Sequence, residues 1–193
     1  MSVEVERSGS ASIPRLAYNN PGLITDLGVG LWAWPLPMDY NQDGLMDLVV
    51  VCTGKPTNGI HVFLNTGEID TVTKLPLFGP STIVGPSAPS PQLSLVDGRT
   101  VVTSAGQVHP EFATKGFSQP VKLGDPSQIH LEAGRIRANQ WKFVDYDGNG
   151  VQDLIVGIDF WGDYGWDDAW DKNGRWTNGP LRGYVYLLKN SRT

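Results

Sequence analysis

The sequence predicts an all-β protein built from many short strands. Turn-forming residues are frequent, with 23 glycines and 14 prolines among 193 residues, and they interrupt the chain about every ten residues. No stretch of about a dozen residues keeps apolar side chains at helical spacing. A hydrophobic content of 40% is sufficient for a packed core, and it argues against a disordered chain.

Two segments repeat the same pattern of a strand, an acidic turn and a second strand. Residues 37–51 read PMDYNQDGLMDLVVV, and residues 143–157 read FVDYDGNGVQDLIVG. Each is followed by a further apolar strand, and the ends of these strands align as FLNT with LLKN. The segment between the two copies is a degenerate copy, in which the hairpin turn Asp97-Gly98 replaces the acidic turn. The spacing of about 50 residues is typical of four-stranded propeller blades.

This repeat predicts a partial β-propeller over residues 22–193, preceded by an N-terminal extension at 1–21. About three four-stranded antiparallel blades are expected, at 31–85, 90–124 and 136–193. A closed propeller needs at least about four blades, and an open arc leaves sheet edges unpaired. We therefore expect the ring to be completed by the remaining blades of a longer chain or by a second copy of this one.

The two acidic turns predict metal sites for calcium. In each turn, alternate residues carry side-chain oxygens, and a glycine permits the sharp bend. Calcium takes about six to eight oxygen ligands, whereas magnesium needs fewer protein oxygens in stricter geometry. The candidate ligands are Asp39, Asn41, Asp43, the backbone carbonyl of Leu45 and Asp47 in the first turn, and Asp145, Asp147, Asn149, the carbonyl of Val151 and Asp153 in the second.

Two other interpretations of these turns compete with calcium binding. An EF-hand is excluded because its twelfth position is Val50 or Val156 instead of glutamate, and because the flanking residues are β-branched. The second interpretation is a metal-free hairpin, since Asp, Asn and Gly are common in turns. The recurrence of the turn in register with matching strands favours the metal.

The string DYNQDGLMDLVV at 39–50 resembles the FG-GAP/VCBS repeats, the calcium-loop repeats of integrin-type β-propellers. The resemblance is strong at both acidic turns and weak in the middle copy, where only Asp97-Gly98 stands in place of the ligands, so no metal is expected there. It implies a propeller of about six to eight blades and a secreted or cell-surface location, although residues 1–12 contain no signal peptide. It also implies adhesion, carbohydrate recognition or a scaffold for polysaccharide lyases and hydrolases.

An aromatic insertion predicts a ligand-binding face. Residues 160–176, FWGDYGWDDAWDKNGRW, fall between the second and third strands of the last copy. Aromatic rings stack on sugar rings and carboxylates accept their hydroxyl groups, so a glycan is one candidate ligand. The alternatives are a private core for the insertion and an interface with a protein partner or missing blades. The candidate residues are Trp161, Tyr164, Trp166, Asp167, Trp170, Arg175 and Trp176.

Composition and motifs exclude several functions. A net charge of −5 without a Lys/Arg run lacks the basic footprint of a nucleic-acid-binding protein, and no apolar segment approaches the roughly 18 residues of a membrane span. The sequence has no nucleophile elbow or complete phosphate loop, and no catalytic residue is assigned. A fragment of a carbohydrate-active enzyme, a polysaccharide lyase or glycoside hydrolase, is the alternative to a calcium-binding recognition module.

Overall fold

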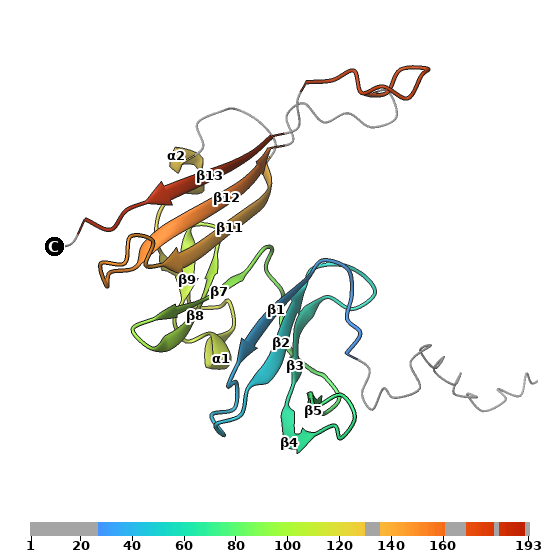
Figure 1. The fold of residues 1–193 in the computed structure, drawn as a ribbon, viewed down its shortest axis with the longest axis vertical. Helices are drawn as coiled ribbons and strands as arrows, with labels where there is room; N and C mark the ends of the chain where they lie inside the picture. The colour runs from blue at the N-terminus through green and yellow to red at the C-terminus, as the bar shows by residue number, and fades with distance from the viewer. Residues whose placement is uncertain (1–26, 130–135, 161–168, 180–181, 192–193) are drawn as a thin grey trace, which may run out of the picture.

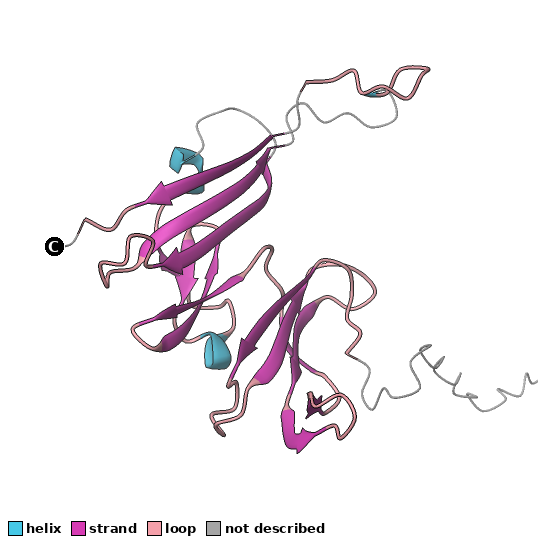
Figure 2. Ribbon diagram, viewed as in Figure 1, coloured by secondary structure: helices cyan, strands magenta, loops and turns pink. Residues whose placement is uncertain are grey.

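The computed structural model describes residues 27–129, 136–160, 169–179 and 182–191 (Figure 1). Within these ranges the protein is all-β, as predicted, with four antiparallel sheets and two helices of a single turn, α1 (Phe112–Lys115) and α2 (Pro126–Ile129). Figure 2 shows that strands dominate the described fold outside the segment 169–179, which is drawn mainly as a loop.

Three of the sheets follow one another along the chain as antiparallel meanders. The first, in the order β1-β2-β3-β6, contains β1 (Ala33–Met38), β2 (Asp47–Cys52), β3 (Gly59–Phe63) and β6 (Thr82–Gly85). The second contains β7 (Gln92–Val96), β8 (Arg99–Ser104), β9 (Gln107–His109) and β10 (Val121–Lys122), in sequence order across the sheet. The third contains β11 (Ile136–Val144), β12 (Asp153–Phe160) and β13 (Arg182–Leu188). A separate hairpin, β4 (Asn65–Ile69) with β5 (Pro76–Phe78), lies between β3 and β6 along the chain.

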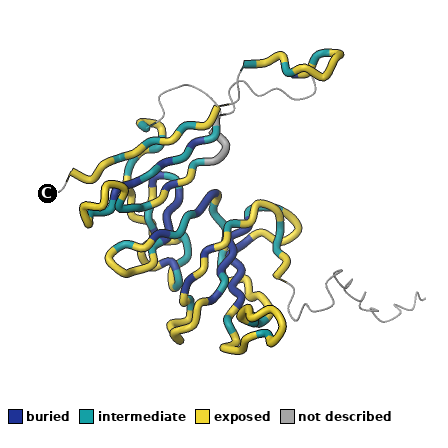
Figure 3. Tube along the Cα trace, viewed as in Figure 1, coloured by how far each residue is buried: buried dark blue, intermediate teal, exposed yellow. Residues whose placement is uncertain are grey.

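The apolar side chains form two cores, one in each seam between successive sheets. The first core joins the first sheet to the second, and the second core joins the second sheet to the third. Figure 3 shows buried segments concentrated in the three sheets and exposed residues in the turns. The first core contains Leu36, Met38, Val49, Val51, Ile60, Val62, Val102 and Phe112. The second contains Trp141, Leu154, Val156 and Ile158, with Ala105 and Ile129 packed against them.

Polar contacts tie the second and third sheets together. The Ser94 hydroxyl on β7 accepts the backbone N–H of Phe143 on β11 at 2.9 Å, and the Thr103 hydroxyl on β8 donates to the backbone carbonyl of Trp141. Strand β7 contacts both β1 and β11. The first strand of each repeat therefore lies against the first strand of its neighbour.

Strand pairing shows that the predicted alignment of the two repeats is wrong by one residue at the third strand, β3 in the first sheet and β13 in the third. Leu48 on β2 pairs with Phe63 on β3, whereas the corresponding Leu154 on β12 pairs with Leu188 on β13. Phe63 therefore corresponds to Leu188, so FLNT aligns with LKNS and not with LLKN. The apolar pattern does not reveal this shift because both versions keep an apolar strand followed by polar residues, and the only local signal is that Asn65 then aligns with Asn190.

Candidate metal centre

The two acidic turns have the same backbone hydrogen bonds, although they belong to different sheets. The carboxylate of Asp39 accepts the N–H groups of Asp43 at 3.1 Å and Gly44 at 3.0 Å. The carboxylate of Asp145 accepts the N–H groups at the corresponding positions, from Asn149 at 3.0 Å and Gly150 at 2.9 Å. In both copies the first aspartate thus organises the turn around its own two oxygens.

The backbone angles repeat as well. Gly44 and Gly150 have φ values of 86° and 84°, which only glycine adopts without strain. Two positions earlier in the turn, Gln42 and Gly148 have φ values of 64° and 73°. A left-handed conformation costs a residue with a Cβ about 1–2 kcal/mol. Gln42 adopts this positive φ in the first turn in spite of that cost, whereas the second turn has glycine at the same position.

Asp47 is the buried carboxylate at the end of the first turn. It is 1% exposed, and its two oxygens accept the backbone N–H groups of Tyr40 at 2.9 Å and Asn65 at 2.7 Å. The Asn65 amide also donates to the carbonyl of Met46 at 3.1 Å. Asp47 therefore links the turn to the chain that leaves β3.

Asp153 has the corresponding role in the second turn. It is 1% exposed, and its Oδ1 accepts the backbone N–H of Asn190 at 2.9 Å, while the Asn190 amide donates to the carbonyl of Gln152 at 3.3 Å. Asp153 Oδ2 is buried and has no hydrogen-bond partner. Asn65 and Asn190 were not predicted, because the one-residue shift hides their equivalence in the sequence.

The remaining predicted ligands lie on the exposed side of the turns. Asn41 donates from its amide to Asp43 Oδ2 at 2.8 Å, and the other Asp43 oxygen accepts the N–H of Leu45 at 2.8 Å. In the second turn the Asn149 side-chain oxygen accepts the N–H of Val151 at the same distance, 2.8 Å.

Asp147 forms an ion pair that the residues at the equivalent positions of the first repeat, Asn41 and Leu64, cannot form. Its Oδ2 lies 2.7 Å from Lys189 Nζ. The hydrogen bond from this ammonium is the main reason why the pKa of Asp147 is lowered, and the same contact raises the pKa of Lys189. The pair joins the turn to the residue that follows β13.

The donor chemistry of both turns fits calcium. Each turn offers three carboxylates and one side-chain amide, which with a backbone carbonyl are the hard oxygen ligands that calcium prefers. Among the described residues, no group of three His, Cys, Asp or Glu side chains is arranged to hold an ion. In the part of the chain that the structure describes, the buried Asp153 Oδ2 has no hydrogen-bond partner, so this oxygen is open to a cation.

Apart from Phe160 at the end of β12, the aromatic insertion is described only from residue 169 onwards. Four of its predicted ligand-binding residues lie outside the described residues: Trp161, Tyr164, Trp166 and Asp167. The other part is a tight turn in which the Asp171 carboxylate accepts the N–H groups of Asn173 at 2.8 Å and Arg175 at 2.9 Å. Figure 1 shows this turn beyond the end of the third sheet that is remote from the acidic turn.

Within the turn, two tryptophans pack on each other. The rings of Trp170 and Trp176 meet edge to face with centroids 5.2 Å apart, and the Trp176 indole donates to the carbonyl of Gly179 at 2.8 Å. Trp170 nevertheless remains 53% exposed, and Arg175 is exposed beside it. The pair is therefore a small local core that still presents an aromatic surface to solvent.

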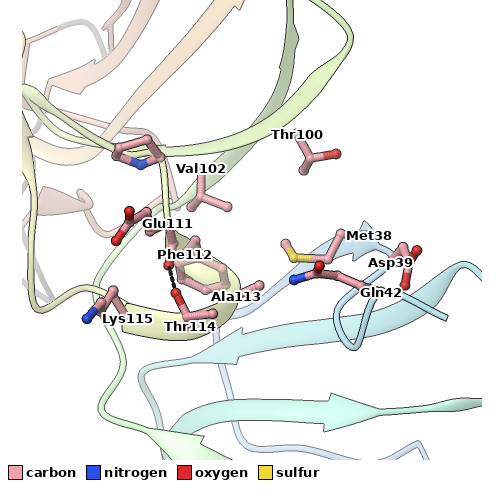
Figure 4. A pocket seen from close by; sticks show the side chains of 11 residues that line it. Met38, Asp39, Gln42, Thr100, Val102, Glu111, Phe112, Ala113, Thr114 and Lys115 are labelled. Atoms are coloured by element: carbon pink, nitrogen blue, oxygen red, sulfur yellow. Dashed lines mark hydrogen bonds between the residues drawn. The ribbon is translucent and has the colours of Figure 1, made fainter. Parts of the chain in front are cut away.

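A hollow of about 620 Å³ opens in the seam between the first and second sheets. Figure 4 shows Met38 and Gln42 reaching toward α1 from the first sheet and its acidic turn, with Phe112 and Ala113 facing them from the helix. Its lining residues are Met38, Asp39, Gln42, Thr100, Val102, Pro110, Glu111, Phe112, Ala113, Thr114 and Lys115. Sequence reasoning did not predict this hollow because its walls come from two separate sheets.

A buried serine–histidine pair lies in the second sheet. Ser104 Oγ is 2.9 Å from His109 Nε2, and burial lowers the pKa of His109. His109 Nδ1 has no hydrogen-bond partner, so no described carboxylate orients the imidazole as in a catalytic triad. His109 instead packs edge to face on Phe117 with centroids 4.9 Å apart, which indicates a core residue.

The comparisons with known proteins bring no further identification: the chain matches no family model, no curated protein and no solved structure. Within the described ranges, no helix is long and apolar enough to cross a membrane.

Proposed function

We propose that this chain is a calcium-stabilised β-propeller module of the FG-GAP/VCBS type, which serves carbohydrate or protein recognition. The observation that carries this proposal is the repetition of one hydrogen-bond network in two turns about 100 residues apart, at Asp39 and Asp47 and again at Asp145 and Asp153. Both turns end in a buried carboxylate, which is a ligand type that calcium prefers. In the second sheet, the two-residue hairpin turn Asp97-Gly98 joins the corresponding strands, β7 and β8.

The way the sheets pack supports a propeller. The face of the first sheet that carries Ile60 and Val62 is covered by the second sheet, and these residues are 1% and 4% exposed. Their equivalents on the third sheet are Val185 and Leu187, which are 77% and 38% exposed. An apolar face in this position suits a further sheet, supplied by the remaining blades or by a second copy of the chain.

Calcium would be held by the predicted ligands of each turn. A bound divalent cation neutralises clustered carboxylates and gives the buried Asp153 oxygen a positive partner. The turns join β1 to β2 and β11 to β12, so the ion would hold together the first two strands of the first and third sheets. No such role falls to the turn between β7 and β8.

Calcium is expected to raise the melting temperature of the chain, and a chelator is expected to lower it. A ligand that binds only the folded state at about 100 times its Kd contributes about 2.7 kcal/mol, equivalent to roughly 5–10 °C for a chain of this size. Thermal unfolding with calcium and with excess chelator measures the shift. The Asp43→Ala, Asp147→Ala double variant should lose it.

The middle sheet supplies a matched control. Asp97→Asn removes one carboxylate from an exposed turn while keeping a residue that tolerates its φ of 50°, and it should leave the calcium response unchanged. A double variant at Asp43 and Asp147 that keeps full calcium binding would show that the ligand assignment is wrong.

The exposed aromatic turn is proposed as the recognition surface. The chain should bind members of a glycan array, and Trp170→Ala should weaken that binding by at least about tenfold without lowering the melting temperature, because Trp170 is mostly exposed. Trp32→Ala is the control, since Trp32 is similarly exposed at 56% but lies before β1. Release of cleaved sugars would favour the enzyme interpretation instead.

A further inference from the structure

Lys189 distinguishes the second acidic turn from the first. Strand pairing places it one residue after Leu188, at the position that Leu64 occupies after Phe63 in the first repeat. Its ammonium lies 2.7 Å from Asp147 Oδ2. The corresponding residue to Asp147 in the first turn is Asn41, which is neutral and bonds within its own turn.

We propose that the Lys189 ammonium is a tethered cation of the 145–153 turn, which calcium must displace, so that this turn binds calcium more weakly than the 39–47 turn and fills second. This inference rests on the proposed calcium function. The predicted ligands of the two turns are of the same kinds. The inference therefore attributes the difference in calcium affinity to a single residue outside the turn, Lys189.

The formal charges of the two ligand sets do not account for a difference in affinity. Each contains three carboxylates and one asparagine, with Asp and Asn exchanged between the third and fifth positions of the turn. The carboxylates are Asp39, Asp43 and Asp47 in the first turn, and Asp145, Asp147 and Asp153 in the second. The formal charge contributed by the ligands is thus equal, and the lysine is the added positive charge.

The exposure of the ion pair makes displacement feasible. The side chains of Lys189 and Asp147 are 59% and 32% exposed, and exposed ion pairs hold their partners weakly. Among the described residues, Asp153 Oδ2 has no hydrogen-bond partner, so Lys189 satisfies only part of the turn by hydrogen bonding. The lysine should therefore reduce calcium affinity without abolishing it, both by competing for Asp147 and by repelling the ion.

Calcium titration calorimetry tests this on the full chain with the first turn disabled by Asp43→Ala. Adding Lys189→Met, which keeps an unbranched side chain and removes the charge, should tighten the remaining site by about three- to tenfold. Lys172→Met removes the same charge from the exposed turn at the other end of the third sheet. This control should change the affinity by less than about twofold.

The outcomes separate the two proposals. If Asp43→Ala still binds calcium but Lys189→Met leaves the affinity unchanged or weakens it, the tethered-cation inference is wrong and the calcium function stands. If the lysine and control variants tighten binding equally, net charge and not the ion pair explains the effect, which also overturns the inference. If the unmodified chain binds no calcium, both proposals fail.

Discussion

Trp141→Ala is expected to lower the free energy of unfolding by about 3–5 kcal/mol, the usual range for a buried tryptophan replaced by alanine. Trp141 is 1% exposed and lies at the centre of the core between the second and third sheets. Its backbone carbonyl also accepts the hydroxyl of Thr103 from the second sheet. Removing the indole leaves a cavity in the seam that joins the two sheets, and the short strands around it can collapse only partly.

Urea denaturation of the calcium-loaded chain measures this effect. Trp170→Ala is the matched control, since it removes the same side chain from a position that is 53% exposed, and it should change the free energy of unfolding by less than about 1 kcal/mol. Equal destabilisation by the two substitutions would contradict the placement of Trp141 in the seam.

Asp47→Ala is expected to destabilise the fold by about 2–4 kcal/mol even when calcium is absent, because two backbone N–H groups lose a charged acceptor at once. These groups belong to Tyr40 in the turn and Asn65 after β3. The substitution would therefore remove the hydrogen bonds that link the turn to the residue after β3. Thermal and urea unfolding in the presence of a chelator isolate this structural effect from any effect of metal binding.

Two further variants show whether the buried network is responsible. Asp47→Asn keeps one acceptor oxygen in nearly the same shape, so it should recover about half of the lost stability. Asp43→Ala removes an exposed carboxylate of the same turn and should have a much smaller effect in chelator. If Asp43→Ala and Asp47→Ala unfold alike under these conditions, Asp47 has no special structural role.

The sequence predicted the position and the bend of the two acidic turns more completely than their surroundings. Both turns lie where their spacing indicated, and glycines 44 and 150 have the positive φ values that the sharp bend requires. These features are local, since they depend on neighbouring residues and on the hydrogen bonds that Asp and Asn make to their own backbone. By contrast, Asn65 and Asn190 reach their turns only through the pairing of β2 with β3 and of β12 with β13.

The middle of the chain shows why the remainder was less predictable. Helix α1 spans only Phe112–Lys115, too few residues for a helical period to appear in the sequence. The β4–β5 hairpin likewise has no counterpart in the repeat. Phe112 nevertheless reaches the first core, because the second sheet brings it against the face of the first.

By itself, the sequence determined that the chain is all-β and where its acidic turns lie, because strand formation and turn chemistry act over a few adjacent residues. Only the tertiary structure decided that Lys189 pairs with Asp147, which sheet faces are buried, and that a hollow opens beside Gln42. Those features join residues far apart in the chain, and a shift of one residue in strand register moves each side chain to the opposite face.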